Sequence, residues 1–345
     1  MEKYGKVSGS LFRTILRNLG KKKASIVIPP GIGLDNGVLS VDGKRVLIHT
    51  TDPISLIPLV GAEKSAWLSL HHLASDFTTS GIMPQYAIMN YNLPPFLADD
   101  QIERFVRSIS QECKRLGIAI VGGHTGRYPG CDLTIIGSAT LFGFADKDAY
   151  LTPKNAKVDD AILLTKGAAI ESTAILASSF QNYVKEKLGK RLWWKAIDYI
   201  QLCSTVKEAI LASKNGATSM HDATEGGVIG ALYELSVACG RRLRVDLQGI
   251  HIPEETKQIC SLFGIDPLRS LTGGSLLITC REDDADKLQE KLKQQGIKSF
   301  RVGKVSADKA MGSVIDKDGR KLVAVTEDPY WSAYSEAIKS GWTKF

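Results

Sequence analysis

Carboxylate, hydroxyl and glycine residues crowd together in the segment MHDATEGGVIGALYELS, which begins at Met220. Asp222 and Thr224 stand just before the pair Gly226 and Gly227, and an apolar run of helical character follows at once. Backbone N–H groups at a glycine-rich helix start bind anions such as phosphate. An ordinary N-cap is the alternative, but it accounts for one polar residue and not for the two glycines. We therefore predict a phosphate site here, with Asp222 in a catalytic role.

A second polar segment is VGGHTGRYPG, residues 121–130. Its amide, imidazole, hydroxyl and guanidinium groups can all serve a phosphate. We assign Gly123, Thr125 and Arg127 to phosphate binding and His124 to catalysis. A histidine considered alone is more often a hydrogen-bonded structural residue, and the assignment depends on its polar neighbours.

Three aspartates are candidate metal ligands. Asp35 lies in PPGIGLDNGVL, where Gly33 lets the backbone approach a phosphate, and Asp52 lies in HTTDP at the end of an expected strand. Asp76 lies late in an expected helix, where a carboxylate is unfavourable unless a cation is close. Mg²⁺ prefers a few carboxylates together with phosphate oxygens and water. The alternatives are a hairpin turn, an Asp-Pro turn and a solvated side chain, respectively.

The spacing of apolar residues predicts the elements that hold these groups. In the first half we expect strands at 44–50, 118–123 and 133–144, the last two buried, and helices at 62–77 and 99–117. In the second half we expect strands at 161–167, 274–280 and 300–305, and helices from Glu171 and at 207–216, 226–240 and 283–296. A polar break at 146–160 separates the halves. The pattern predicts an α/β (α+β) protein with domains at 1–150 and 151–345.

Composition excludes several classes of protein. The chain has 345 residues, is 43% hydrophobic and carries a formal net charge of +7, without the basic, aromatic-rich face that nucleic-acid binding requires. No apolar run reaches the length of a membrane span, and no signal peptide opens the chain, so we expect a cytoplasmic protein. The six cysteines have no zinc-site or disulfide-framework spacing. Walker, dinucleotide-binding, nucleophile-elbow and zinc-protease motifs are absent.

Taken in order, five segments resemble motifs of the aminoimidazole-ribonucleotide synthetase (PurM) superfamily. GIGLDNGVL is similar to its G-I-G-[DE]-D-A-A-V segment, HTTDP to T-[TD]-D, and LASDFTTSGIMP to N-D-[LI]-A-x-x-G-A-x-P. GGHTGRYPG stands where members carry G-G-[DEH]-T, and MHDATEGGVIGAL is similar to D-P-T-R-G-G. The resemblance spans nearly the whole chain and is strongest to the hydrogenase-maturation protein HypE.

The resemblance implies an N-terminal domain that pairs with that of a second copy and a C-terminal domain that closes over the site. It implies ATP and Mg²⁺ as cofactors and transfer of phosphate to a small-molecule or carrier substrate. Asp35, Asp52 and Asp76 would hold Mg²⁺ between the phosphates, and Asp222, Thr224 and the two glycines would complete the phosphate site.

Four departures separate the chain from the family pattern. Leu34 replaces an acidic residue, Asn36 and Gly37 replace a pair of small residues, and His124 stands where several members have a carboxylate. The last cysteine is Cys280, so we do not expect the carbamoyl chemistry that HypE performs on a C-terminal cysteine. The alternatives are a nucleotide-binding maturation partner without catalysis and an enzyme like thiamine-monophosphate kinase.

Overall fold

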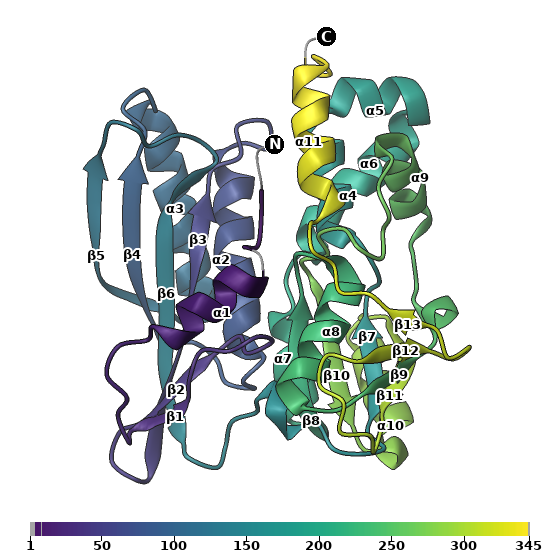
Figure 1. The fold of residues 1–345 in the computed structure, drawn as a ribbon. Coiled ribbons are helices and arrows are strands. Elements are labelled where there is room, and N and C mark those ends of the chain that lie inside the picture. Colours follow the sequence, from purple (N-terminus) through teal and green to yellow (C-terminus); the bar gives the residue numbers. More distant parts are fainter. Residues whose placement is uncertain (1–3, 8, 344–345) are drawn as a thin grey trace.

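A computed structural model describes residues 4–7 and 9–343, which form two lobes side by side, each built on one sheet (Figure 1). The N-terminal lobe has a six-stranded sheet in the order β1-β2-β3-β6-β4-β5. Its strands are β1 (Ile26–Ile28), β2 (Gly37–Ser40), β3 (Arg45–Ser55), β4 (Tyr86–Leu93), β5 (Ala119–Arg127) and β6 (Ile135–Asp146). All neighbours are antiparallel except β4 and β5. The prediction of a mixed α/β protein is confirmed.

Two helices cover one face of this sheet, α2 (Ala62–Thr78) and α3 (Asp99–Leu116), and a shorter helix α1 (Gly9–Arg17) precedes them. Leu70, Leu73 and Phe77 recur at helical spacing on α2, and all three are buried in the core of the lobe. The predicted helices at 62–77 and 99–117 are therefore confirmed. Gly117 ends α3 in the left-handed conformation.

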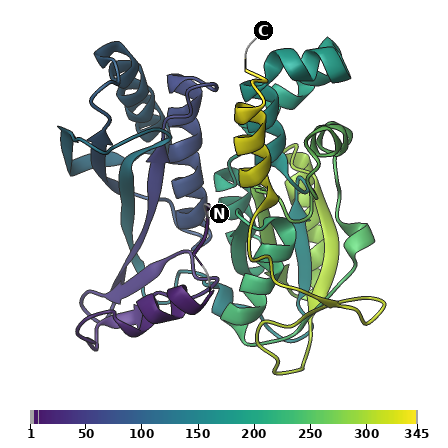
Figure 2. The ribbon, with the colours of Figure 1, turned by 45° about the horizontal axis from the view of Figure 1, so that its top comes forward.

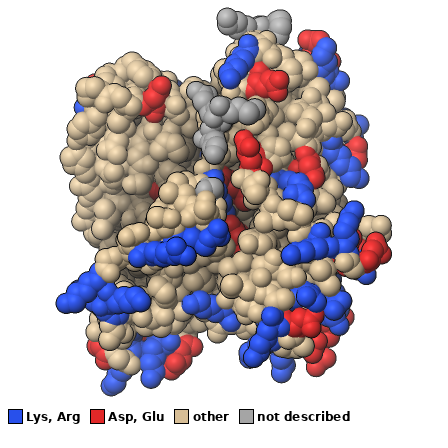
Figure 3. Space-filling model, viewed as in Figure 1, with Lys and Arg blue, Asp and Glu red and all other residues tan. Residues whose placement is uncertain are grey.

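The opposite face of this sheet is open at β5. We expected residues 118–123 to form a buried strand, but Ile120 and Val121 are 45% and 54% exposed. The apolar run of β5 is therefore not buried within the described chain. Ile88 and Ile135 are also exposed, and Figure 3 shows few charged side chains over this part of the lobe.

The C-terminal lobe has a seven-stranded sheet in the order β13-β12-β9-β11-β7-β10-β8. Its strands are β7 (Ala161–Thr165), β8 (Ala217–Ala223), β9 (Leu243–Val245), β10 (Ser275–Cys280), β11 (Ser299–Val305), β12 (Val314–Asp316) and β13 (Lys321–Leu322). Every residue of β7 and β10 is buried, as their continuous apolar sequence predicts.

Eight α-helices and three 3₁₀ helices pack around this second sheet. The α-helices are α4 (Ile170–Ser179), α5 (Gln181–Leu188), α6 (Lys190–Ile197), α7 (Val206–Ser213), α8 (Gly227–Cys239), α9 (Glu254–Phe263), α10 (Glu282–Gln294) and α11 (Pro329–Lys339). The 3₁₀ helices are η1 (Pro153–Asn155), η2 (Asp198–Leu202) and η3 (Leu247–Gly249). No helix in the described part of the chain is both long enough and apolar enough to cross a bilayer.

The lobes meet where α2 packs against α7 and β8. Figures 1 and 2 both show α11 and α8 on the side of the C-terminal lobe that faces α2. Two local predictions are corrected here. Asp52 lies inside β3 and not at its end, and Asp222 lies inside the unpredicted strand β8.

Candidate functional site

Four aspartates from four different elements converge between the lobes. Asp35 precedes β2, Asp52 lies on β3, Asp76 on α2 and Asp222 on β8. The side chains of Asp76 and Asp222 share a hydrogen bond, and ligand atoms of Asp35 and Asp222 lie within 4.8 Å of each other. Asp52 interacts electrostatically with Asp76 and Asp222. Among the described residues, the ligand atoms close enough to share one ion belong to Asp35, His221 and Asp222, and the predicted ligands Asp52 and Asp76 lie beside this group without joining it.

Burial and mutual repulsion disfavour the charged forms of Asp52, Asp76 and Asp222. Burial, followed by the charges of Asp222 and Asp52, raises the pKa of Asp76 well above its usual value. Burial raises the pKa of Asp52 to about 7, with repulsion from Asp222 adding to it. The pKa of Asp222 rises to about 6, mainly through burial and the charge of Asp35. A divalent cation would reverse this balance by favouring the ionised carboxylates.

Two buried oxygen atoms in this cluster have no hydrogen-bond partner among the described residues, Oδ2 of Asp35 and Oδ1 of Asn36. Nδ2 of Asn36 donates to the carbonyl of Asp76 at 2.8 Å and to Oγ1 of Thr79 at 2.9 Å, which fixes the orientation of the amide. Unsatisfied carboxylate and amide oxygens are the ligands that Mg²⁺ prefers. The donor set therefore fits Mg²⁺. In the sequence, Asn36 stands out only as a departure from the family pattern.

A buried histidine links the aspartates to α8. Nδ1 of His221 lies 2.8 Å from Oδ1 of Asp35, and Nε2 lies 3.2 Å from Oε2 of Glu234. Nζ of Lys6 lies 2.7 Å from Oε1 of Glu234 and extends this series of ion pairs. Burial alone would lower the pKa of His221, but the contacts with Asp35 and Glu234 raise it to about 10. Without a metal, His221 is therefore a buried cation beside Asp35, and its ring nitrogen is also the third candidate metal ligand next to Asp35 and Asp222.

Gly33 lies against the backbone of this same part of α8. A Cβ atom on Gly33 would come within 2.2 Å of the carbonyl oxygen of Glu234. Close packing against the backbone of α8 therefore accounts for Gly33 as well as the predicted phosphate binding does. The absence of a side chain lets the segment before β2 approach α8.

The predicted anion site at the start of α8 already has internal partners. The N–H of Gly226 donates to Oδ2 of Asp328 at 2.7 Å, and that of Gly227 donates to the carbonyl of Thr224 at 3.1 Å. Gly226 is itself the N-cap residue, so neither Asp222 nor Thr224 caps the helix. Gly227 has φ of 64°, and a Cβ atom there would lie 2.6 Å from the carbonyl oxygen of Leu268.

The segment before α11 therefore places a carboxylate where a phosphate was expected. Burial raises the pKa of Asp328 to about 6, against the hydrogen bonds from Gly226 and Tyr330. Glu225 is held beside it, because Nε1 of Trp331 and the backbone N–H of Lys6 donate to its carboxylate at 2.7 and 2.8 Å. Nothing in the sequence indicates the contact between Gly226 and Asp328, which are about 100 positions apart.

The second predicted phosphate segment lies elsewhere in the chain. Gly123, His124, Thr125 and Arg127 belong to β5, which β6 and β4 separate from β3. Three strand spacings put it about 14 Å from Asp52 on β3. His124 contacts the hydroxyl of Tyr128.

Arg127 is occupied within its own lobe. Its guanidinium donates to the carbonyls of Pro94 and Pro95, at 3.2 and 3.3 Å, and pairs with Asp99 at the start of α3. One chain alone thus does not bring the β5 residues to the aspartate cluster.

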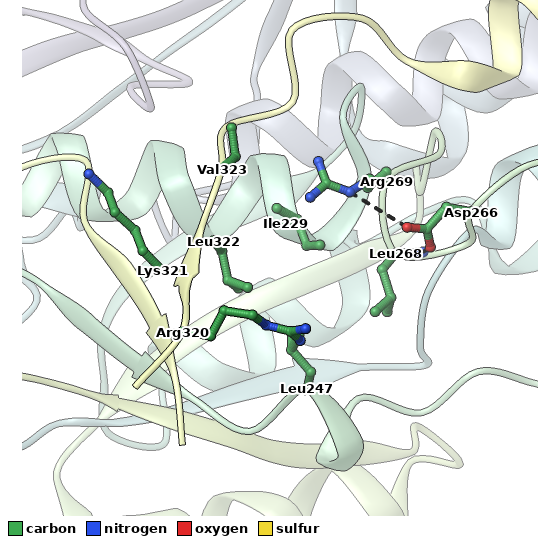
Figure 4. A pocket seen from close by; sticks show the side chains of 9 residues that line it. All are labelled: Ile229, Leu247, Asp266, Leu268, Arg269, Arg320, Lys321, Leu322 and Val323. Atoms are coloured by element: carbon green, nitrogen blue, oxygen red, sulfur yellow. Dashed lines mark hydrogen bonds and ion pairs between the residues drawn. The ribbon is translucent and has the colours of Figure 1, made fainter. Parts of the chain in front are cut away.

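A pocket of about 330 Å³ opens on the C-terminal lobe beside the first turn of α8 (Figure 4). Its apolar lining includes Ile229 and Leu322, and its basic side chains are Arg269, Arg320 and Lys321. Arg269 pairs with Asp266 at 3.6 Å, as the dashed line in Figure 4 marks. The pocket contains none of the predicted site residues.

Comparison with known proteins identifies both lobes. Residues 33–145 match the N-terminal domain, and residues 157–316 the C-terminal domain, of "AIR synthase related protein". A putative hydrogenase expression/formation protein of Methanocaldococcus jannaschii is 24% identical, covering 91% of this chain and 93% of that protein. The carbamoyl dehydratase HypE of Escherichia coli is also 24% identical, over 85% and 82% of the two chains.

Solved structures share the fold. AaThiL complexed with AMPPCP and TMP superposes with a TM-score of 0.72 at 18% identity, covering 95% of this chain and 99% of that one. The hydrogenase maturation protein HypE in complex with ATP superposes with a TM-score of 0.63 at 20% identity, over 92% and 91% of the chains.

Proposed function

This chain belongs to the AIR synthase related proteins, and we propose that it is an enzyme that uses ATP and Mg²⁺ to phosphorylate a small-molecule or carrier substrate. The observation that supports this most directly is the cluster of four aspartates between the lobes, with unsatisfied buried oxygens on Asp35 and Asn36. Relatives that are named for enzymes or bind ATP point the same way. We assign nucleotide binding to residues 1–150 and closure of the site to residues 151–345.

In this proposal Asp35, Asp52 and Asp76 hold Mg²⁺, with Asn36 as a further oxygen ligand. The metal would neutralise charge on the transferring phosphate, and the protein mainly positions the reactants. Asp222 shares a hydrogen bond with Asp76 and reaches the same space from the other lobe. It would therefore orient the metal-bound phosphates as the lobes close.

The start of α8 takes part only if Asp328 moves. A phosphate oxygen that replaces the Asp328 carboxylate would accept the same N–H of Gly226. Thr224 and Gly227 would then border the phosphates. No cation contacts the Asp328 carboxylate among the described residues. We therefore expect a metal-bound phosphate to replace it at the N–H of Gly226.

We further propose that two copies pair through the open face of β4 and β5. Ile88 on β4, Ile120 and Val121 on β5, and Ile135 on β6 are exposed apolar side chains in this part of the sheet that a second copy would cover. Pairing would let His124 and the other β5 residues reach the aspartate cluster of the second copy.

A second candidate function is a nucleotide-binding maturation partner without catalysis. It is favoured by the internal carboxylate at Gly226, and by the name of the hydrogenase expression/formation relative. A kinase for thiamine monophosphate is a third, suggested by the AaThiL fold. Thiamine monophosphate is a doubly anionic acceptor, which the carboxylates of this site would repel.

Release of ADP from Mg·ATP, measured with and without thiamine monophosphate, tests these candidates together. We expect Mg²⁺-dependent turnover that Asp76→Asn abolishes, while Asp286→Asn, an exposed aspartate on α10, leaves it unchanged. Tight ATP binding without turnover would favour the maturation partner. Stimulation by thiamine monophosphate would favour the kinase.

A further inference from the structure

A buried carboxyl and an imidazole face each other beside the aspartate cluster, and the proposed function gives them no role so far. His72 lies on α2 four residues before Asp76, so both side chains project from the same face of the helix. Glu171, in the first turn of α4, reaches it from the other lobe, with Oε1 3.4 Å from Nε2 of His72. Glu171 is only 5% exposed, and Nε2 of His72 is a buried atom without a hydrogen-bond partner among the described residues.

A glycine keeps space open at this contact. A Cβ atom on Gly273 would lie 2.1 Å from Oε2 of Glu171 and 3.1 Å from Nε2 of His72. Gly273 does not have a positive φ, so a side chain at this position is excluded by lack of space and not by the backbone conformation. Its N–H donates to the Glu171 carboxylate, which fixes the carboxylate's position.

The surroundings of this pair are acidic. The titratable groups that interact with Glu171 or His72 come from β3, α2, α11, the segments before α8 and α11, and the residue after η2. They are Asp52, His71, Tyr330, Glu225, Asp328 and Cys203. No lysine or arginine contributes to the pKa shift of either group. Burial, with repulsion from Asp328 and Glu225, raises the pKa of Glu171 to about 8, and burial lowers that of His72 to about 4.

We propose that Glu171 and His72 form the acceptor end of the site, where they bind a neutral or cationic O–H or N–H group and Glu171 takes its proton during phosphoryl transfer. The inference rests on the proposed function and specifies its substrate class. Anionic acceptors are disfavoured because four carboxyl groups lie at or around this pair, and Lys6 beside Glu225 balances only one of them. Nε2 of His72 accepts a hydrogen bond from the entering group.

The step conserves atoms and charge. The acceptor oxygen or nitrogen forms a bond to the γ-phosphorus, and the bond from that phosphorus to the β,γ-bridging oxygen breaks. ADP leaves with the electron pair. The proton of the acceptor passes to the ionised carboxylate of Glu171, whose basicity near pH 8 suits a general base better than an ordinary glutamate would.

The test compares Glu171→Gln and His72→Asn with a matched pair elsewhere on α2. His71 and Glu112 form a similar buried contact at 3.5 Å between α2 and α3, so Glu112→Gln serves as the control. ADP release from Mg·ATP is measured in water alone, with hydroxylamine as a neutral acceptor, and with inorganic phosphate as an anionic one. Calorimetry gives the Mg·ATP affinity of each variant.

We expect hydroxylamine to stimulate the wild type and inorganic phosphate not to do so. Glu171→Gln should lower the stimulated rate by about 100-fold or more and remove its rise with pH, with the Mg·ATP affinity unchanged. His72→Asn should raise the KM for hydroxylamine, and Glu112→Gln should behave as wild type.

Full turnover in Glu171→Gln, a parallel loss of Mg·ATP binding, or equal stimulation by phosphate would overturn the inference. A wild type that turns over ATP with none of the three acceptors would overturn the proposed function, and this inference with it. The two failures are therefore distinguishable, because the first requires an active wild type.

Discussion

Replacing Asp52 by asparagine should stabilise the metal-free protein, although it removes a residue of the proposed active site. Folding raises the pKa of Asp52 to about 7, from an ordinary value of 3.8. A carboxyl whose pKa is raised by folding favours the folded state below its unfolded pKa. That advantage is lost as the pH rises through the folded-state pKa. At pH 8 the ionised Asp52 therefore destabilises the folded protein.

The size of the effect follows from the shift. A difference of about 3 pKa units corresponds to about 4 kcal/mol at pH 8. The Asp52 side chain is partly accessible to solvent, which screens its repulsion from Asp76 and Asp222. We therefore expect Asp52→Asn to raise the free energy of unfolding by about 1 to 3 kcal/mol, at pH 8 without metal.

Urea denaturation in EDTA, at pH 8 and at pH 4, measures this gain. The gain should be largest at pH 8 and vanish near pH 4, where the wild-type carboxyl is protonated. Mg²⁺ should stabilise the wild type and have a smaller effect on the variant. Asp286→Asn, on the exposed face of α10, should change none of these values. A variant that is less stable than the wild type at pH 8 would refute the electrostatic reasoning.

Three further predictions concern the surroundings of the cluster. Asp328→Ala removes a charged acceptor from two N–H groups, so the free energy of unfolding should fall by about 1 to 3 kcal/mol in urea denaturation. The same change should tighten Mg·ATP binding in calorimetry, and an unchanged affinity would mean that phosphate does not use the N–H of Gly226. The raised pKa of His221, about 10, means that its stabilising charge is present below about pH 6.5 and is lost as the pH rises through 10. His221→Gln should accordingly flatten the fall in melting temperature between pH 8 and 10.5, and an equally steep fall would argue against the buried cation. Val121→Lys on the open face of β5 should convert a dimer to monomers in sedimentation, whereas a wild type that is already monomeric would disprove the proposed pairing.

The sequence predicted most elements whose own residues decide their structure. The apolar runs of β7 and β10 and the periodic face of α2 require nothing beyond local pattern and burial. The prediction failed at β5, because an apolar run cannot distinguish a strand covered by its own chain from one left open. Short, late elements such as β12, β13 and α11 were not anticipated, since their burial depends on long-range packing.

The candidate site was predicted in part. The family resemblance placed three candidate aspartates at the site, and the structure puts Asp35 beside Asp222, with Asp52 and Asp76 next to them. The partners that set their electrostatics could not be found this way. His221 becomes a cation only because Asp35 and Glu234 flank it in space, and Asp328 reaches Gly226 from about 100 residues away. Glu171 resembled an ordinary first-turn carboxylate until the fold placed it against His72.

The central claim is that Mg²⁺ at the aspartate cluster holds the phosphates of ATP. Calorimetric titration of ATP into the wild type and into Asp52→Asn, each with Mg²⁺ and with EDTA, tests this claim most directly. We predict binding to the wild type only when Mg²⁺ is present, and loss of that binding in a variant that remains folded. Equal affinity with and without Mg²⁺, or full affinity in Asp52→Asn, would contradict the account.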